Sequence, residues 1–451
     1  MKKKLTKSHV SFEQRDRAAL VPAQKVLIRN AKIIGGQQKA NTLFDILIVD
    51  GKIAELKPGL ELSHDFGGQI IDATGLLVFP GFMDLHVHFR EPGREDEETI
   101  RSGAAAAMAG GFTAACTMPN TQPVTDNKEI VEYIQDQVKN HLVKIYPIAA
   151  ITRGQKGEEI VDIAELIDAG VVAFSDDGRS VANSLVLRRA MEYARMFDVP
   201  IIEHCEDSNL AAGGAMHEGY MSTKLGMPGI PAIAEDIVVA RNIMLAEYLQ
   251  CKIHIAHVST AGAVELIRRA KEKGIQVTAE VTPHHFTLTD ETIGTFDANY
   301  KMNPPLRDSF HIDALIRGLK DGAIDAIATD HAPHSAEEKE AEFEIAPFGI
   351  IGLETAVGLV TTQLVGTGQL TWDQVAEKMS LNPCSIVGVD APAIRVGETA
   401  NLTIIDPEKK WMVDKSAFKS RSQNSPFIGR ELKGKPVLVF NQGYYYSNDR
   451  T

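Results

Sequence analysis

Two short segments, far apart in the chain, carry the residue types of a metal-dependent hydrolase. Residues 84–92 read DLHVHFREP and residues 328–334 read ATDHAPH. Side chains two positions apart on a β-strand point to the same face, so His86 and His88 can present two imidazoles to one metal ion. Asp330 adds a carboxylate at the end of another apolar run. Together the segments predict a metal centre more strongly than a lone His-X-His motif does.

The elements that would position these residues alternate along the middle of the chain. Short apolar runs, which predict buried strands, are separated by stretches of helical periodicity, as in a parallel α/β sheet. Eight such runs suit a closed (β/α)8 barrel. The apolar runs are residues 78–85, 113–117, 144–151, 171–174, 200–203, 252–256, 276–280 and 323–328. The helical stretches include residues 128–141, 186–196, 235–248 and 262–273.

In such a barrel the active site forms at the carboxyl ends of the strands, where residues from different strands face one another. These positions are rich in donors of the kinds that zinc accepts. Each donor alone has an ordinary structural explanation, such as a helix cap, a core imidazole or a turn carboxylate. Their shared placement favours a metal centre. The residues are His86, His88, Asn120, Asp176, Asp177, His204, His257 and Asp330.

The positions of four other histidines argue against direct metal binding. His254 precedes His257 by three, so strand alternation predicts that it faces away from the site and is structural. His284 and His285 follow the seventh run, but adding them to the site would exceed the usual coordination number of zinc, so we expect them behind the ligands. His217 lies with Glu218 in a glycine-rich loop and is predicted to be solvated.

Short strands flank the barrel segment on both sides. Residues 25–79 alternate in the manner of β-strands, with Asp50-Gly51 as a hairpin turn, and short strands return near the C-terminus. We therefore predict a small β-sandwich module built from both chain ends. The expected domains are an N-terminal arm (1–24), the first segment of the β-module (25–79), the catalytic barrel (80–394) and the second segment of the β-module (395–451).

Composition narrows the classes of function. The chain has 451 residues and a formal net charge of -13, and its basic residues are scattered, so no nucleic-acid partner is expected. The basic N-terminus lacks the apolar stretch of a secretory signal, and no run is long enough to predict a membrane span. The four cysteines show no CxxC spacing, which favours free thiols in a reducing cytoplasm.

At this point the chain resembles the dihydroorotases of the cyclic-amidohydrolase superfamily, in particular their bacterial type I branch. The segments DLHVHFREPG and ATDHAPH, the latter followed by four residues and then Lys339, look like the two signatures of that family. The resemblance extends from Lys25 to Phe440. Further matching segments are TMPN (117–120), FSDDG (174–178), EH (203–204), HIAHVS (254–259), EVTPHH (280–285), MNPPLR (302–307) and NSPFIG (424–429).

The resemblance implies roles for particular residues. His86 and His88 would hold one metal with Asp330, and His204 and His257 would hold a second, with one or two zinc ions per subunit. Asp177 would take the place of the carboxylated lysine that bridges the metals in many relatives, because no lysine occurs there. The substrate carboxylate would be held by Arg90, Asn120 and His334, and the ring by Asn303 and the backbone at Phe348 and Gly349.

The reaction implied is the reversible hydrolysis of (S)-dihydroorotate to N-carbamoyl-L-aspartate, a step of pyrimidine biosynthesis, with Asp330 moving the proton. The alternatives within the enzyme class are allantoinase and dihydropyrimidinase (hydantoinase), against which Arg90 and the absent strand-four lysine count. A non-enzymatic alternative is an inactive subunit that scaffolds aspartate transcarbamoylase, but such proteins typically lose metal ligands and this chain keeps all six.

We accordingly expect a cytoplasmic enzyme whose partner is a small-molecule substrate, with no nucleic-acid or membrane partner. The resemblance further implies a homo-oligomer, a dimer, with aspartate transcarbamoylase as a candidate protein partner.

Overall fold

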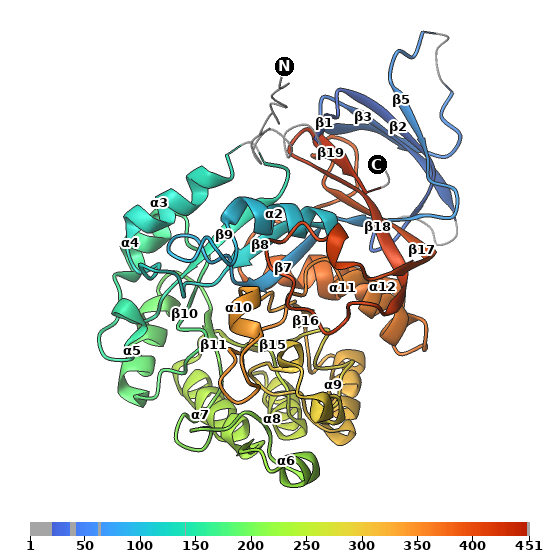
Figure 1. Cartoon of the computed structure of the whole chain (residues 1–451). Helices are drawn as coiled ribbons and strands as arrows, with labels where there is room; N and C mark the ends of the chain where they lie inside the picture. The colour runs from blue at the N-terminus through green and yellow to red at the C-terminus, as the bar shows by residue number, and fades with distance from the viewer. Residues whose placement is uncertain (1–19, 37–41, 62–64, 140, 449–451) are drawn as a thin grey trace, which may run out of the picture.

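The computed structural model describes residues 20–36, 42–61, 65–139 and 141–448. In these residues a parallel eight-stranded barrel lies beside a largely antiparallel sheet built from both chain ends (Figure 1). The predicted fold class is therefore confirmed. The predicted N-terminal arm falls mostly outside the described residues, although Val21–Pro22 forms the short strand β1.

The barrel strands follow one another in chain order around the sheet. Every neighbouring pair is parallel, as βα units require. Closure depends on a parallel bridge between Val87, in the first strand, and His331, just beyond the last. The strands are β7 (Phe82–Val87), β8 (Phe112–Thr117), β9 (Lys144–Ala149), β10 (Ala173–Ser175), β11 (Ile201–Glu203), β14 (Ile253–Ile255), β15 (Val277–Val281) and β16 (Ala326–Ile327).

Helices cover the outside of the barrel between successive strands (Figure 1). Most begin at a polar side chain that caps the first turn, such as Asn127, Asn183 and Thr260. The barrel helices are α2 (Ile100–Ala109), α3 (Lys128–Gln137), α4 (Ile163–Asp168), α5 (Ser184–Arg195), α7 (Ile233–Leu249), α8 (Ala261–Glu272) and α9 (Ser309–Asp321). Beyond β16 follow α10 (Ala336–Lys339), α11 (Ala356–Leu359), α12 (Trp372–Ala376) and α13 (Asn382–Ile386).

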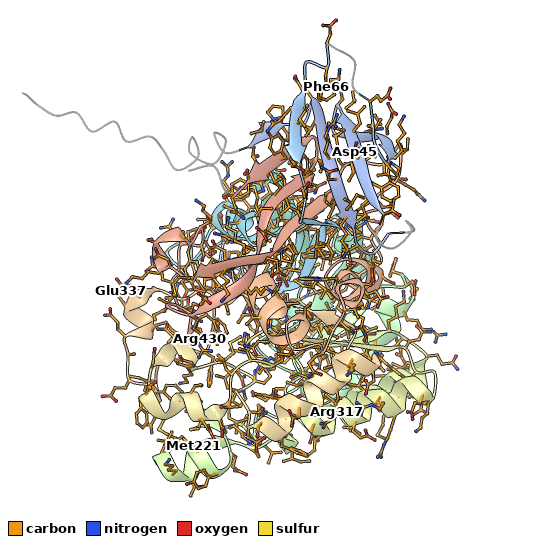
Figure 2. The ribbon with its side chains drawn as sticks, turned by 90° about the vertical axis from the view of Figure 1, so that its right-hand side faces the viewer. Asp45, Phe66, Met221, Arg317, Glu337 and Arg430 are labelled. Carbon is orange, nitrogen blue, oxygen red and sulfur yellow. The ribbon has the colours of Figure 1, made fainter. Side chains whose placement is uncertain are left out.

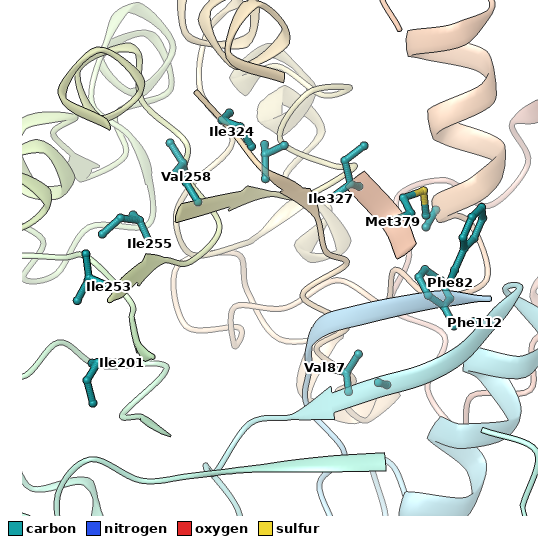
Figure 3. Close-up of a cluster of buried hydrophobic side chains, with 14 of the residues drawn as sticks. Phe82, Val87, Phe112, Ile201, Ile253, Ile255, Val258, Ile324, Ile327 and Met379 are labelled. Atoms are coloured by element: carbon teal, nitrogen blue, oxygen red, sulfur yellow. The ribbon is translucent and has the colours of Figure 1, made fainter. Parts of the chain in front are cut away.

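Apolar side chains pack on both faces of the barrel wall. The outer cluster includes Ile201 on β11, Ile255 on β14 and Ile327 on β16 (Figure 3). A second cluster fills the interior with residues such as Leu85, Ile202 and Ala256. Burial on both faces explains why the strands read as nearly continuous apolar runs rather than alternating ones.

The second sheet joins the two ends of the chain. Its longest strands are β2 (Lys25–Ile33), β17 (Leu402–Met412) and β18 (Glu431–Asn441). It extends away from the barrel, with Asp45 and Phe66 at the end opposite Met221 (Figure 2). Its remaining strands are β1 (Val21–Pro22), β3 (Leu43–Val49), β4 (Lys52–Lys57), β5 (Gln69–Asp72), β6 (Leu77–Pro80) and β19 (Tyr444–Ser447).

The turn from β3 to β4 is the hairpin that the sequence predicts. Asp50 and Gly51 both have positive φ, 48° and 74°, and connect the paired residues Val49 and Lys52. These are the φ signs of a type I′ turn.

One predicted strand is in fact two. The apolar run 78–85 divides at Gly81, because Leu77–Pro80 pairs in the second sheet while Phe82–Val87 opens the barrel. A Cβ atom on Gly81 would overlap the side chains of Asn401 and Thr113. Apolar character alone could not locate this division, since both halves are buried.

Thr403, a buried residue of β17, connects the second sheet to the barrel. Its Oγ1 accepts a hydrogen bond from the Phe82 amide (3.1 Å) and donates one to the Gly111 carbonyl (2.7 Å). Both partners are also buried, so neither can form a hydrogen bond with water instead.

We predict that Thr403→Val lowers the free energy of unfolding by about 1–3 kcal/mol, because it leaves a buried donor and a buried acceptor unpaired. Denaturant unfolding of the metal-loaded protein measures this change. Thr367→Val, at an exposed turn position, is the matched control and should stay within about 0.5 kcal/mol of wild type. Equal stabilities of the two variants would contradict the role given to Thr403.

Candidate metal centre and active site

The six predicted ligands converge at one end of the barrel, each in or just beyond its strand. All six are buried. Three overlapping groups have donor atoms within 4.8 Å of one another: His86, His88 and Asp177; His86, His257 and Asp330; and Asp177, His204 and His257. The convergence follows from the fold, because parallel barrel strands present their carboxyl ends on one face.

Asp177 lies between two pairs of imidazoles. Its Oδ2 is 3.4 Å from Nε2 of His86 and 3.3 Å from Nε2 of His88. Its Oδ1 is 3.2 Å from Nε2 of His257 and 3.7 Å from Nδ1 of His204. A carboxylate whose two oxygens face two sets of nitrogen donors is arranged as a bridge between two ion positions.

The rings of His86 and His88 are fixed from behind. Nδ1 of His86 is 2.7 Å from Glu280 Oε1, and Nδ1 of His88 is 2.8 Å from Asn120 Oδ1. Both partners are acceptors, so each Nδ1 carries a hydrogen, and each Nε2 would turn its lone pair to a bound ion in place of a proton. The buried Nε2 of His86 has no hydrogen-bond partner, and Asp330 Oδ1 lies 3.5 Å away. A divalent cation would fit between these imidazole nitrogens and the carboxylate oxygens that face them.

The electrostatics of the cluster lead to the same conclusion. Burial acts to raise the pKa of Asp177, but the positive charge of His86 and hydrogen bonds from neighbouring imidazoles outweigh it and hold that pKa well below its usual range. The pKa of Asp330 is likewise lowered by His86 and His88 against the effect of burial. For His204, burial lowers the pKa, yet Asp177 outweighs burial and raises it to about 10. The carboxylates therefore require positive charge, which protons supply to the metal-free cluster.

Two of the ligands have unusual backbone conformations. His257 has φ of 31° and Asp330 has φ of 47°, in the left-handed region that non-glycine residues rarely occupy. Such strain persists where the surrounding structure fixes it, and it is common at functional sites. Both residues lie beyond the ends of their strands, so the left-handed backbone conformation sets the direction of each side chain.

These turns explain why the orientation predicted for His254 was wrong, although the structural role predicted for it agrees with its contact to Glu280. Strand β14 ends at Ile255, so the alternation assumed between His254 and His257 does not reach His257. His254 is buried, and its Nε2 is 3.3 Å from Oε2 of Glu280, the residue that anchors His86. It supports the cluster from behind.

The remaining candidates are distinguished by their partners. Asp176 accepts hydrogen bonds from the Ile151 and Thr152 amides. Its carboxylate therefore binds the backbone after β9 and does not join the cluster. His285 is engaged by the Pro304 carbonyl at 2.8 Å. His284 is buried, and this burial lowers its pKa to about 4.

His217, predicted to be solvated, is instead buried, with Nδ1 3.1 Å from the guanidinium of Arg307. Its position in the short strand β12 (Met216–His217) accounts for the burial. Its neighbour Glu218 is exposed, as predicted.

A cavity of about 160 Å³ opens over the cluster. It is a pocket for a small molecule with a few convergent polar groups. Four of the predicted substrate-binding residues line it: Arg90, Asn120, Asn303 and Phe348. His334 and Gly349 are not among the lining residues and lie behind Phe348, since Phe348 O is 2.8 Å from His334 Nε2.

Positive charge gathers at one end of this cavity. Arg90 Nε contacts the Pro333 carbonyl at 3.2 Å and Glu97 at 3.3 Å, which directs the guanidinium. His334 places Nδ1 2.9 Å from Glu97 and Nε2 2.8 Å from the Phe348 carbonyl. Both ring nitrogens of His334 therefore face acceptors within the protein. Arg90 provides a cationic group for an anion.

The Gly349 backbone is engaged within the protein. Its amide donates to the Lys301 carbonyl at 2.9 Å, and its carbonyl accepts from Asn424 Nδ2 at 3.0 Å. A Cβ atom on Gly349 would lie 2.6 Å from the His334 ring, so only glycine fits here.

Comparison with known proteins identifies the family of this chain. Residues 75–263 match a family model described as "Dihydro-orotase-like". The chain is 50% identical to a dihydroorotase of Pelotomaculum thermopropionicum over 94% of this chain and 99% of that protein. It is 48% identical to one from Syntrophus aciditrophicus, over 93% and 98% respectively. The chain belongs to the dihydroorotase family.

Solved structures of related enzymes share the fold of this dihydroorotase-family chain. An L-hydantoinase (dihydropyrimidinase) from Arthrobacter aurescens superimposes with a TM-score of 0.81 at 26% identity, covering 92% of this chain and 94% of that one. A dihydropyrimidinase from Brevibacillus agri gives 0.80 at 22% identity, covering 93% and 94%. The protein is an enzyme, a metal-dependent hydrolase of cyclic amides. Among the residues that the structure describes, no helix is both long and apolar enough to cross a bilayer.

Sequence reasoning assigned no role to three residues that support the site in this family member. Glu280 anchors His86, Glu97 contacts both Arg90 and His334, and Lys339 lies behind Phe348 and Gly349. A buried glutamate at the end of an apolar run was the available signal for Glu280. Glu97 gives no such signal, because its segment, REDEE, reads as a solvated charge run.

We predict that Glu280→Gln weakens metal affinity by about 10–100-fold, because the neutral amide no longer fixes the Nδ1 hydrogen of His86 as strongly. Titration against a competing chelator measures the affinity. Glu235→Gln is the matched control: this buried glutamate holds Ser259 and Thr260 without touching any proposed ligand. Unchanged affinity in Glu280→Gln would remove the anchoring role.

Proposed function

We propose that this enzyme is a dihydroorotase, which reversibly hydrolyses (S)-dihydroorotate to N-carbamoyl-L-aspartate in pyrimidine biosynthesis. The observation that carries the proposal is one small cavity that joins the imidazole–carboxylate cluster to a cationic end formed by Arg90 with His334 behind it. A cyclic amide bearing a carboxylate matches both ends. The high identity to curated dihydroorotases supports the same substrate.

We propose that His86, His88 and Asp330 hold one ion and that His204 and His257 hold another, with Asp177 between them. Four imidazoles and two carboxylates suit zinc, and the opposed oxygens of Asp177 support occupancy by one or two ions. A bound ion supplies positive charge that acidifies water and polarises the amide carbonyl.

The residues at the other end of the cavity would orient the substrate. A guanidinium fork binds a carboxylate through two parallel hydrogen bonds, which suits Arg90. Asn120 accepts from His88 through its Oδ1, which leaves its amide hydrogens for the same carboxylate. The buried Oδ1 of Asn303 has no partner and would accept from a ring N–H.

His334 and Gly349 would contribute to binding through their contacts behind Phe348. The His334 ring, 3.5 Å from the Arg90 guanidinium, would help to position that guanidinium. Phe348, which lines the cavity, would lie against the ring of the substrate.

Asp330 would move the proton. Its Oδ1 is 3.0 Å from His88 Nε2, which leaves Oδ2 for the reacting groups. The carboxylate accepts a proton from the attacking water, whose oxygen bonds to the amide carbon. As the ring C–N bond breaks, the same proton passes to the leaving nitrogen, so one group serves as base and then acid.

The alternatives differ in substrate rather than fold. Allantoinase and dihydropyrimidinase (hydantoinase) activities need no carboxylate-binding cation, so Arg90 favours dihydroorotate. An inactive subunit that scaffolds aspartate transcarbamoylase would not need a complete ligand set, whereas all six residues converge here.

The proposal extends to the setting of the enzyme. Four buried free thiols support a reducing compartment, the cytoplasm. A homodimer is supported by an exposed apolar row on α7, formed by Ile233, Ile237, Met244 and Tyr248. Aspartate transcarbamoylase remains the proposed protein partner on family resemblance.

We predict that Asp330→Asn lowers kcat for dihydroorotate by about 10²–10⁴-fold, the usual contribution of a general acid–base group. Because Asp330 is also a proposed ligand, kcat is compared per bound metal ion, with metal content determined by elemental analysis. A variant that keeps kcat within a few-fold of wild type at equal metal content would show that another group moves the proton.

We predict that wild type prefers dihydroorotate to dihydrouracil and that Arg90→Ala lowers kcat/KM for dihydroorotate by at least about 30-fold, with little change for dihydrouracil. Loss of one partner of a buried charge pair costs about 2–5 kcal/mol, and about 1.4 kcal/mol is tenfold. Initial rates with dihydroorotate, dihydrouracil and allantoin at matched metal content measure the ratios. If wild type prefers a neutral ring, the assignment passes to hydantoinase or allantoinase.

A further inference from the structure

Lys339 is a buried lysine that the proposed reaction does not use. It is the last residue of α10, and its side chain reaches into the segment that carries Phe348. Its Nζ donates to the carbonyls of Pro347 at 2.9 Å and Gly349 at 3.0 Å, and lies 3.5 Å from the Lys301 carbonyl. An ammonium group has three hydrogens to donate, so its donors match this set of acceptors.

The carbonyls of three consecutive residues are thereby all engaged by side chains. Lys339 takes those of Pro347 and Gly349, and His334 takes that of Phe348 at 2.8 Å. Asn424 is a second donor to the Gly349 carbonyl at 3.0 Å. Three side chains therefore hold this short segment through four hydrogen bonds.

The segment forms one wall of the substrate cavity through Phe348. Behind the wall, Lys301 Nζ lies 4.5 Å from the centroid of the Phe348 ring, within the range of a cation–π interaction. The Gly349 amide also donates to the Lys301 carbonyl. The ring is therefore fixed from behind, and its backbone is fixed by Lys339.

We propose that Lys339 is a positioning residue: its Nζ sets the backbone from Pro347 to Gly349 and, through it, the Phe348 wall of the substrate cavity. This inference rests on the proposed function for its substrate. Lys339 touches neither the metal cluster nor the cavity, so its removal should affect binding of the ring rather than the chemical step.

The test replaces Lys339 with Met, which keeps the length of the side chain and removes its donors. We expect KM for dihydroorotate to rise about tenfold, equivalent to about 1.4 kcal/mol. kcat and metal content should stay within about twofold of wild type, and Lys339→Arg, which restores N–H donors, should bring KM back towards wild type. Wild-type KM in Lys339→Met, or a KM in Lys339→Arg as high as in Lys339→Met, would overturn the proposal.

The matched control is Lys378→Met. Lys378 is also buried and donates to a carbonyl, that of Ile324 at 2.7 Å, but at the amino end of β16, away from the site. It should lose stability without a change in KM. If its KM rises as in Lys339→Met, the effect is general to buried lysines and the proposal fails.

A second variant covers the case in which Lys339→Met does not fold. Asn424→Asp removes the other side-chain donor to the Gly349 carbonyl and should also raise KM with little change in kcat. An unchanged KM would count against positioning by this segment.

Wild-type activity separates the two proposals. If wild type does not open dihydroorotate, the proposed function fails, and Lys339→Met is then assayed with the ring that wild type does open, because Phe348 borders any ring in the cavity. If wild type opens dihydroorotate and KM in Lys339→Met is unchanged, only the role of Lys339 fails.

Discussion

Closure of the barrel between its first strand and the segment after its last is the constraint on which the site depends. Val87 bridges to His331, and the His88 amide donates to the His331 carbonyl at 2.9 Å. Deeper in the barrel, Asp84 Oδ1 accepts from the Thr329 amide at 3.1 Å. These contacts join segments that are far apart in the chain and place His88 beside Asp330. Without this closure the two signature segments, residues 84–92 and 328–334, could not contribute donors to the same proposed metal centre.

The structure surrounds the charged cluster with successive supports. Glu280 holds His86, and His254 lies beyond Glu280. At the other end of the cavity, Glu97 holds Arg90 and His334 in the same way. Because an unpaired charge is costly inside a protein, each functional group needs such a partner, and the partners are buried as deeply as the groups that they hold.

Much of the barrel and of the proposed site could be predicted from the sequence, because the carboxyl ends of the strands meet on one face of a parallel barrel. The eight apolar runs located the strands, and the residues after them located the proposed ligands. Prediction failed where a residue leaves the regular strand. His254 was given the wrong face because His257 lies in a left-handed turn, and the strand at Gly81 was not divided because both halves are buried. Glu97 and Lys339 act through contacts across the fold, which local spacing does not encode.

The order of the ligands along the chain has a consequence for biosynthesis. A growing chain that ends before Thr329 already contains His86, His88, Asp177, His204 and His257, yet it lacks Asp330 and the segment that closes the barrel. The proposed ligands therefore come together as a complete set only after the last strand has been synthesised and docked.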